Sequence, residues 1–320
     1  MKLATYKDGT RDGQLVVVSR DLSTAHYATG IANRMQQLLD DWDFISPQLQ
    51  DLYETLSSGK ARHAFPFDPA MCMAPLPRAF QYLRGAAYPS HVALLSQATG
   101  QTASEGLQLS QAASDHLLGA HDPVPYLQEK TGVDFGAALV VATGDVPQGT
   151  MNEALEAEIH LVMLANEVCL RHVTDAVQNQ PASAFAPVAI TRDELGDAWD
   201  HGALHLTVQT AWNGRKVGMC DAGTDMAHTF EQLLAHACKT RSLRAGTLVS
   251  TGVVSNAGHN QQWPKGYHSI AEKRAMETLL DGQASTDYLK LEDTVRIEVK
   301  GKDGQSVFGA IEQRVGSRAA

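Results

Sequence analysis

One short segment of this chain gathers residues that suggest metal chemistry without any further context. His116, His121 and Asp122 stand close together in "SDHLLGAHDPV". At this spacing they suggest a transition-metal site, because imidazole nitrogens and carboxylate oxygens are both metal ligands. An ordinary solvated loop would have the same polar composition. On these residues alone both interpretations stay open.

The cysteines and the glycine turns give weaker indications of chemistry than this segment does. Cys72, Cys169, Cys220 and Cys238 are scattered, with neither a metal-like nor a disulfide-like spacing. We therefore expect buried, reduced cytosolic thiols. No lysine or arginine clearly activates Cys169, so we expect an inert thiol there rather than a nucleophile. The segments "GTRDG" and "GKDGQ" lack the spacing of a phosphate-binding loop and read as hairpin turns.

The segment "DFGAALVVATGDVPQGT", residues 134–150, predicts a strand that ends at a Gly-Asp turn and a proline. Residues i and i+2 of a strand point to the same face. Here those positions are Gly136 and Ala138, which carry no functional group. The strand therefore supplies no chemistry of its own.

The composition and the net charge of the chain exclude some classes of protein. Of the 320 residues, 43% are hydrophobic and 19% are charged, which is ordinary for a soluble chain. The net charge is −10, and no lysine or arginine cluster offsets it, which argues against nucleic acid as a partner. No stretch approaches the ~20 apolar residues of a membrane span, and the N-terminus does not resemble a signal peptide. We expect a cytoplasmic protein.

The N-terminal residues predict a small domain. Residues 3–20 alternate like a β-hairpin, and helices are expected over residues 28–39 and 45–56. The proline-dense segment 65–78 cannot form a helix or a central strand. We interpret it as a linker between a small domain, residues 1–70, and a main domain, residues 71–320.

The main domain reads as rich in strands. We expect one strand over residues 159–171, another over 246–255, and hairpins over 204–218 and 293–312. Asn213-Gly214 predicts a type I′ turn in the first hairpin. One helix is expected over residues 225–239. Many strands with few helices predict a β-rich α+β fold.

Several long motifs, in order, carry a family resemblance. They are "NGRKVGMCDAG", "AHACKTRSLRAGTLVSTG", "AEKRAMETLLDGQ" and "GKDGQSVFGAIEQ". The chain resembles the two-domain bacterial branch of the fumarylacetoacetate hydrolase family over nearly its whole length. This implies a small N-terminal domain, a C-terminal mixed β-roll and a homodimer. It also implies cleavage of a carbon–carbon bond in a β-diketone-type acid, using Mg²⁺ or Ca²⁺.

The resemblance also implies that the metal ligands are largely missing. The family's paired glutamates fall on Gly136 and Ala138, and its first aspartate falls on Arg84. Only the last acidic position is kept, as Glu167. A single carboxylate holds Mg²⁺ poorly and a guanidinium repels it, so we predict no metal and no other cofactor.

The family's water-activating pair is kept as His91 and Glu272. A carboxylate on one imidazole nitrogen fixes the tautomer and leaves the other nitrogen to act as a base. The alternative is a core histidine in a structural hydrogen bond. Arg84 has two interpretations that do not exclude each other: it pairs with Glu167, or it binds a substrate carboxylate through its fork.

Other substrate-binding positions are altered, according to the resemblance. The family's lysine falls on Gln180, its tyrosine on Ser110 and its threonine on Val253. Its two glycines fall on Ala112 and Ala113, and its arginine on Ser96 or Thr99. The resemblance places His116, His121 and Asp122 on a loop that leads away from the site, so we favour the solvated loop.

Three functions follow as hypotheses. The first is a diverged enzyme that transfers a proton without a metal. Its substrate would be a small oxo acid or a polyketide-like carbonyl compound, and its reaction an isomerisation, cyclisation, dehydration or C–C cleavage. The second is a catalytically inactive binding protein that keeps the cavity. The third is a conventional hydrolase of the family.

Overall fold

The computed structural model describes residues 1–100, 102, 106–125, 128–151, 153–258 and 266–316. The chain begins with the expected antiparallel hairpin, β1 (Lys2–Tyr6) and β2 (Gln14–Val18). Two further strands, β3 (Thr24–Tyr27) and β4 (Phe65–Pro66), extend it. The proline-dense segment thus begins as an edge strand, where a missing backbone N–H is tolerated.

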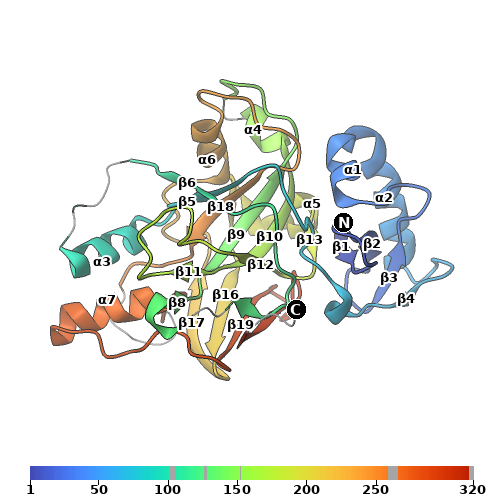
Figure 1. The fold of residues 1–320 in the computed structure, drawn as a ribbon. Helices are drawn as coiled ribbons and strands as arrows, with labels where there is room; N and C mark the ends of the chain where they lie inside the picture. The colour runs from blue at the N-terminus through green and yellow to red at the C-terminus, as the bar shows by residue number, and fades with distance from the viewer. Residues whose placement is uncertain (101, 103–105, 126–127, 152, 259–265, 317–320) are drawn as a thin grey trace.

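Two helices, α1 (Met35–Asp40) and α2 (Trp42–Ser57), lie beside this hairpin (Figure 1). The helix expected over residues 45–56 is confirmed, with Ile45, Leu49, Tyr53 and Leu56 buried. The helix expected over residues 28–39 is wrong in its first half. Gly30 has a positive φ of 89°, and Arg34 is extended, so helical hydrogen bonding starts only at Met35.

The main sheet runs through both parts of the chain. Its order is β4-β3-β2-β1-β13-β10-β9-β18-β5-β6, with β12 paired to β10. The C-terminal members are β5 (Tyr82–Gly85), β6 (Leu109–Ala112), β9 (Ala137–Thr143), β10 (Ile159–Glu167), β12 (Ser183–Phe185), β13 (Ala189–Ile190) and β18 (Leu248–Val253). Because β1 pairs with β13, the N-terminal strands continue the sheet of the main part.

A second sheet has the order β17-β16-β19-β20-β7. It contains β7 (Val124–Pro125), β16 (Thr207–Trp212), β17 (Arg215–Asp221), β19 (Thr294–Lys300) and β20 (Ile311–Gly316). Both expected hairpins are confirmed. Asn213 and Gly214 have φ values of 49° and 73°, as a type I′ turn requires. Two small ribbons pair β8 (Val133–Asp134) with β11 (Cys169–Leu170), and β14 (Trp199–Asp200) with β15 (Ala203–Leu204).

The helices α3 (Pro89–Thr99) and α7 (Ile270–Asp281) pack against each other at the end of the molecule far from α1 and α2 (Figure 1). The other short helices are α4 (Glu153–Ala157), α5 (Arg192–Leu195) and α6 (Phe230–Ala237), with 3₁₀ turns η1 (Pro69–Met71), η2 (Glu129–Thr131) and η3 (Gly196–Ala198). The helix expected over residues 225–239 is shorter, because Asp225 has a left-handed φ and Thr229 caps the helix with Gln232.

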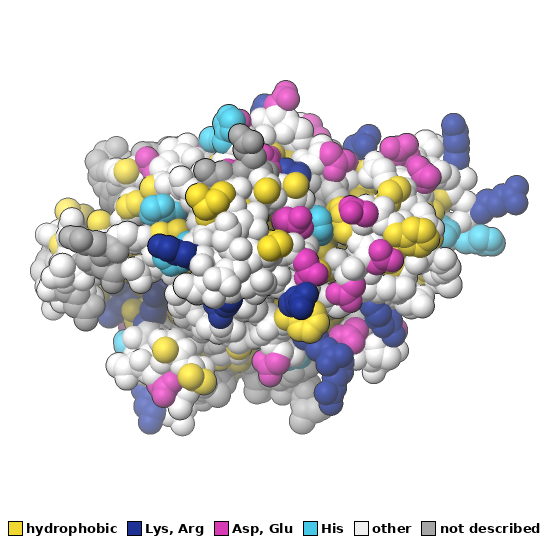
Figure 2. Space-filling view, turned by 90° about the horizontal axis from the view of Figure 1, so that it is seen from above, with side chains coloured by type: hydrophobic (Ala, Val, Ile, Leu, Met, Phe, Trp, Pro, Cys, Tyr) yellow, Lys and Arg dark blue, Asp and Glu magenta, His cyan; other side chains and the backbone are white. Residues whose placement is uncertain are grey.

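The hydrophobic core includes the central strands of the main sheet, whose residues are buried on both faces. All seven residues of β9 are buried, which explains its continuous apolar sequence. On the face shown in Figure 2, acidic and basic side chains are interspersed and apolar ones are scattered. Within the described ranges, no helix combines the length and apolarity that crossing a membrane requires. The fold is α+β and rich in strands, as expected from the sequence.

Candidate functional site

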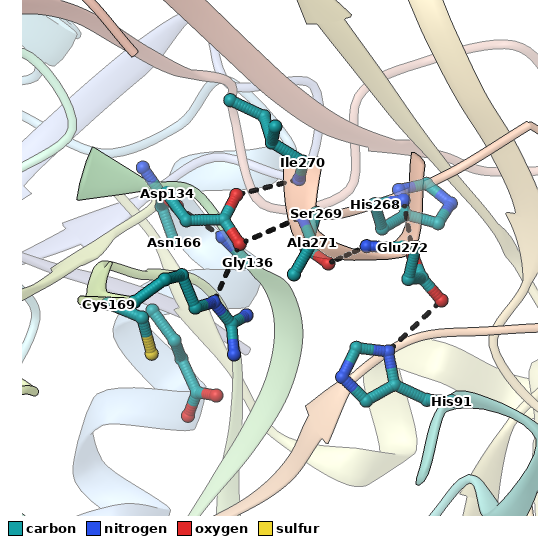
Figure 3. Close-up of polar contacts among 12 residues, drawn as sticks. His91, Asp134, Gly136, Asn166, Cys169, His268, Ser269, Ile270, Ala271 and Glu272 are labelled. Atoms are coloured by element: carbon teal, nitrogen blue, oxygen red, sulfur yellow. Dashed lines mark hydrogen bonds and ion pairs between the residues drawn. The ribbon is translucent and has the colours of Figure 1, made fainter. Parts of the chain in front are cut away.

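Helices α3 and α7 bring His91 and Glu272 together, although 181 positions separate them in the chain. The Nδ1 atom of His91 lies 3.0 Å from Oε1 of Glu272 (Figure 3). The other carboxylate oxygen accepts a hydrogen bond from the backbone N–H of His268 at 2.9 Å. Because a carboxylate accepts, Nδ1 of His91 carries the hydrogen, and the neutral form of the ring keeps its lone pair on Nε2.

The two side chains differ in exposure. The Glu272 side chain is 1% exposed and the His91 side chain is 14% exposed. The carboxylate is thus held inside while the imidazole keeps access to solvent. This is the arrangement expected of a base and the group that orients it, and it is also compatible with a structural hydrogen bond.

The local sequence explains why both residues lie in the first turn of a helix. Pro89 occupies the start of α3, where a missing N–H costs nothing, so His91 follows directly in that turn. Ser269 is the N-cap of α7 and its hydroxyl accepts from the backbone N–H of Glu272. Each side chain therefore projects from the first turn of its helix, and in α7 that turn is capped by Ser269.

A second polar group lies in the interior of the main sheet. The Nε atom of Arg84, on β5, lies 2.9 Å from Oε2 of Glu167, on β10, and the side chains are 8% and 0% exposed. Nη2 of Arg84 also donates to the backbone oxygen of Glu167 at 3.3 Å. Burial lowers the pKa of Arg84, but the Glu167 carboxylate raises it above its ordinary value. Arg84 is therefore the counter-ion of Glu167.

Sequence reasoning missed two further partners of Glu167. Oε1 of Glu167 accepts from the hydroxyl of Tyr82 at 2.7 Å and from that of Ser250 at 2.6 Å. Tyr82 lies two residues before Arg84, and this spacing could have indicated a shared strand face. Ser250 is the parallel neighbour of Arg84 across β5 and β18, which no local pattern reveals. Burial, and then the Glu167 charge, raise the pKa of Tyr82 well above its usual value.

The resemblance places the family's first paired glutamate at residue 136, and the structure has no room there for a long side chain. A Cβ atom on Gly136 would lie 3.0 Å from the backbone oxygen of Glu167 and 3.1 Å from a methyl group of Val253. Ala138 is fully buried and is the strand neighbour of Val253. Space for a longer side chain at residue 136 is therefore taken by Val253 and by the main chain of β10.

The residues present do not fit Mg²⁺ or Ca²⁺. Such cations need several oxygen ligands, whereas Glu167 offers one carboxylate that already binds a guanidinium and two hydroxyls. Over the residues that the structure describes, no group of three or more His, Cys, Asp or Glu side chains could hold a metal ion.

The structure differs from the expectation for Cys169 in the burial of the thiol and adds a contact that the sequence did not reveal. This thiol is half-buried, and Nη1 of Arg84 lies 3.4 Å from its Sγ atom, so an arginine does contact it. The contact could not be seen in the sequence because 85 positions separate the two residues. Cys72, Cys220 and Cys238 are buried free thiols, as expected.

The other residues assigned from the sequence lie in different places. Ser110, on β6, is the cross-strand partner of Arg84 and is exposed. Val253 packs beside Gly136. Gln180 is half-buried, and its Oε1 atom is buried without a hydrogen bond to any described residue. Thr99, in the last turn of α3, bonds back to the Leu95 carbonyl, and Ser96 lies one turn earlier.

The segment with His116, His121 and Asp122 is a loop with structural contacts. The Asp122 carboxylate accepts from the backbone N–H of Gly119 at 2.8 Å and pairs with Lys7 at 3.4 Å. Both histidines are exposed. These contacts favour the solvated loop over a metal site.

Comparison with protein families gives two adjoining matches. Residues 1–78 match the fumarylacetoacetase N-terminal domain 2, and residues 81–316 match the fumarylacetoacetate hydrolase C-terminal domain. The chain has no match among curated protein sequences.

Solved structures share the fold over the full length. A fumarylacetoacetate hydrolase from Exiguobacterium antarcticum is 16% identical with a TM-score of 0.69, covering 99% of this chain and 100% of that one. A putative HpcE protein from Mycobacterium smegmatis is 17% identical, with a TM-score of 0.68 and 99% of both chains covered.

A third neighbour was solved with ligands. It is maleylpyruvate hydrolase from Sphingobium sp. SYK-6 in complex with manganese(II) and pyruvate, 16% identical with a TM-score of 0.65, and all of both chains are covered. At these identities the likeness is one of fold, and the domain matches establish the relationship. Together they show that this chain belongs to the fumarylacetoacetate hydrolase family.

Proposed function

We propose that this protein is an enzyme that moves a proton on a small oxo acid or related carbonyl compound without a bound metal. His91 is the general base and Glu272 orients it. His91 takes the proton from carbon, or from water, on its Nε2 atom. In an isomerisation the same proton returns to a different carbon of the resulting enolate.

The observation that carries the proposal is the geometry of the pair. One carboxylate oxygen of Glu272 faces Nδ1 of His91 at 3.0 Å, and the other is fixed by a backbone amide. The histidine tautomer is thereby set, and the 14% of His91 that stays exposed gives it access to a ligand. A histidine with a purely structural role would not need this access.

Arg84 is proposed to supply the positive charge of the site. Nε of Arg84 forms the ion pair with the Glu167 carboxylate, and Nη1 and Nη2 each use one N–H, on Cys169 and on the Glu167 backbone oxygen respectively. A guanidinium carries five N–H donors, so one on each of Nη1 and Nη2 has no acceptor among the described residues and is proposed to bind a carboxylate or a developing enolate oxygen. Ser110, Val253 and Gln180 are proposed as further substrate contacts.

The conventional hydrolase is the weaker hypothesis. In it a divalent cation stabilises the enolate, a contribution of several kcal/mol. The ion pair between Arg84 and Glu167 and the closed space at Gly136 argue against that cation. We propose that the metal site has been lost and that the protein works in the cytoplasm as a homodimer.

A second candidate function is a binding protein without catalysis. It is favoured by one observation: Arg84 and Glu167 neutralise each other in the interior, and Tyr82 and Ser250 complete the contacts of Glu167. Such a cluster is charge-neutral without a ligand. The protein would then bind an oxo acid and report its presence.

A substrate screen separates these functions. Metal-stripped protein is mixed with pyruvate, 2-oxobutyrate, oxaloacetate and longer acylpyruvates, with and without Mg²⁺ or Mn²⁺. Turnover and the shift in melting temperature are measured in parallel. Turnover that does not change with metal supports the proposed enzyme, and turnover that appears only with metal overturns it in favour of the hydrolase. Ligand-induced stabilisation with no turnover of any compound supports the binding protein.

A further inference from the structure

The first turn of α7 is tied to the main body by a buried carboxylate, Asp134. Its two oxygens accept from the backbone N–H of Ile270 at 2.6 Å and from that of Ala271 at 3.2 Å (Figure 3). Asp134 comes from the short strand β8 and is fully buried. It therefore satisfies the first two amides of the helix, which have no partner within the helix itself.

The neighbouring amides have other acceptors. The N–H of Glu272 bonds to the hydroxyl of Ser269, and the N–H of His268 bonds to Oε2 of Glu272. The four amides of His268, Ile270, Ala271 and Glu272 thus bond to three different side chains. As a result, Glu272 has one oxygen left to hold His91.

Asp134 is itself held in place. Arg171 lies 2.8 Å from Oδ2 of Asp134, and β8 pairs with β11 so that Asp134 faces Cys169 across the ribbon. Burial raises the pKa of Asp134, and the Arg171 charge opposes that rise. The carboxylate is thus anchored on the sheet side and presents its oxygens to the helix.

We infer that Asp134 is a positioning residue for the base: by satisfying the Ile270 and Ala271 amides, it keeps Glu272 directed at His91. This inference rests on the proposed function, in which His91 is the base. A glutamate at the third position of a helix can fold back onto a backbone amide at the helix start, and Glu272 already does so at His268. Without Asp134, the two buried amides would compete with His91 for the Glu272 carboxylate.

The test reads the His91 tautomer directly and needs no substrate. Protein labelled with ¹⁵N-histidine is studied by long-range ¹H–¹⁵N NMR, and the His91 signals are assigned by their absence in His91→Gln. In the unaltered protein we expect the pattern of a neutral ring protonated at Nδ1. Asp134→Ala should lose that single pattern and show a mixture of tautomers.

A matched control lies on the same helix. Glu277 accepts from the backbone N–H groups of Ser285 and Thr286, both at 2.8 Å, so Glu277→Ala also removes the acceptor of two amides. It should lower the melting temperature but leave the His91 signals unchanged. A purely structural role of Asp134 predicts the same result for both variants.

A milder variant covers the case in which Asp134→Ala does not fold. Asp134→Asn keeps one carbonyl oxygen and so serves one of the two amides, and we expect a partial shift toward the mixed pattern. A folded Asp134→Ala or Asp134→Asn with the unaltered His91 pattern would overturn the inference. Absence of turnover in the substrate screen would overturn the proposed function and would leave this NMR result standing.

Discussion

A few single residues decide which chemistry this family member can perform. Arg84 places a cation where the resemblance expects an aspartate, and it pairs with the one acidic group that is kept, Glu167. Removing one partner of a buried ion pair leaves an uncompensated charge, which is far more costly than losing an exposed pair. The pair is therefore expected to matter for stability as well as for the site.

The first prediction concerns this pair. Arg84→Met should destabilise the protein by about 3 to 5 kcal/mol, because Glu167 is left buried beside hydroxyls alone. The double variant Arg84→Met/Glu167→Gln should recover much of that loss. Urea unfolding of the three proteins measures the differences.

An exposed pair provides the control. Arg244 lies 3.5 Å from Asp145, and their side chains are 77% and 62% exposed. Arg244→Ala should cost below about 1 kcal/mol. If Arg84→Met costs no more than Arg244→Ala, the buried pair does not balance charge as described.

The second prediction concerns the closed space at Gly136. Gly136→Ala should destabilise by about 1 to 3 kcal/mol, because the new methyl group presses on the Glu167 carbonyl and on Val253. Gly316→Ala is the control, since a Cβ there meets nothing within 4 Å. Thermal unfolding of both variants tests this, and equal effects would mean that the position has room for a side chain.

Contacts between whole elements join the N-terminal helices to the main sheet. The indole of Trp42, at the start of α2, stacks on the imidazole of His160, on β10, with ring centroids 4.1 Å apart and planes 4° apart. Burial lowers the pKa of His160 from 6.5 to about 4, although Asp43 nearby opposes the shift. The neutral ring is thus the form that packs between these elements.

The third prediction follows from the sign of that shift. The unfolded chain binds a proton at His160 near pH 6.5, whereas the folded protein does so only near pH 4. The free energy of unfolding should therefore fall as the pH drops through this window, by roughly 2 to 3 kcal/mol. His160→Phe keeps an aromatic ring on Trp42 but cannot titrate, so its unfolding curve should lose this part of the pH dependence. An identical dependence in both proteins would contradict it.

Local sequence patterns predicted which helices and strands form better than they predicted the residues at which these elements begin and end. The buried strand β9 and the Asn213-Gly214 turn follow from apolar runs and turn chemistry, which act over a few residues. The helix start at Met35 was missed because a single left-handed glycine, Gly30, overrides an apolar period that continues past it. The start of α6 was misplaced for a similar reason at Asp225.

For the whole molecule, the resemblance predicted the architecture and the contact of His91 with Glu272. It did not predict the surroundings of Glu167 or of α7. Ser250 reaches Glu167 across 83 positions, and Asp134 reaches Ile270 across 136. Such contacts depend on strand order and register, which residue patterns alone do not determine.

The fourth prediction concerns assembly. The resemblance implies a two-fold dimer through the main domain, with a large and apolar closed contact. Light scattering at micromolar concentration should give twice the chain mass of 34.5 kDa. A monomer at this concentration would contradict the dimer and would leave the single-chain contacts of His91 and Arg84 unaffected.

The central claim is that His91 moves protons on an oxo acid without a metal. The most direct measurement follows deuterium exchange at the carbon next to the carbonyl of pyruvate, or of the best compound in the screen, in D₂O with chelator present. We predict exchange catalysed by the unaltered protein and a loss of roughly 10² to 10⁴ in rate for His91→Gln. Glu272→Gln should lose less, because the base stays in place. Equal exchange rates for His91→Gln and the unaltered protein would contradict the account.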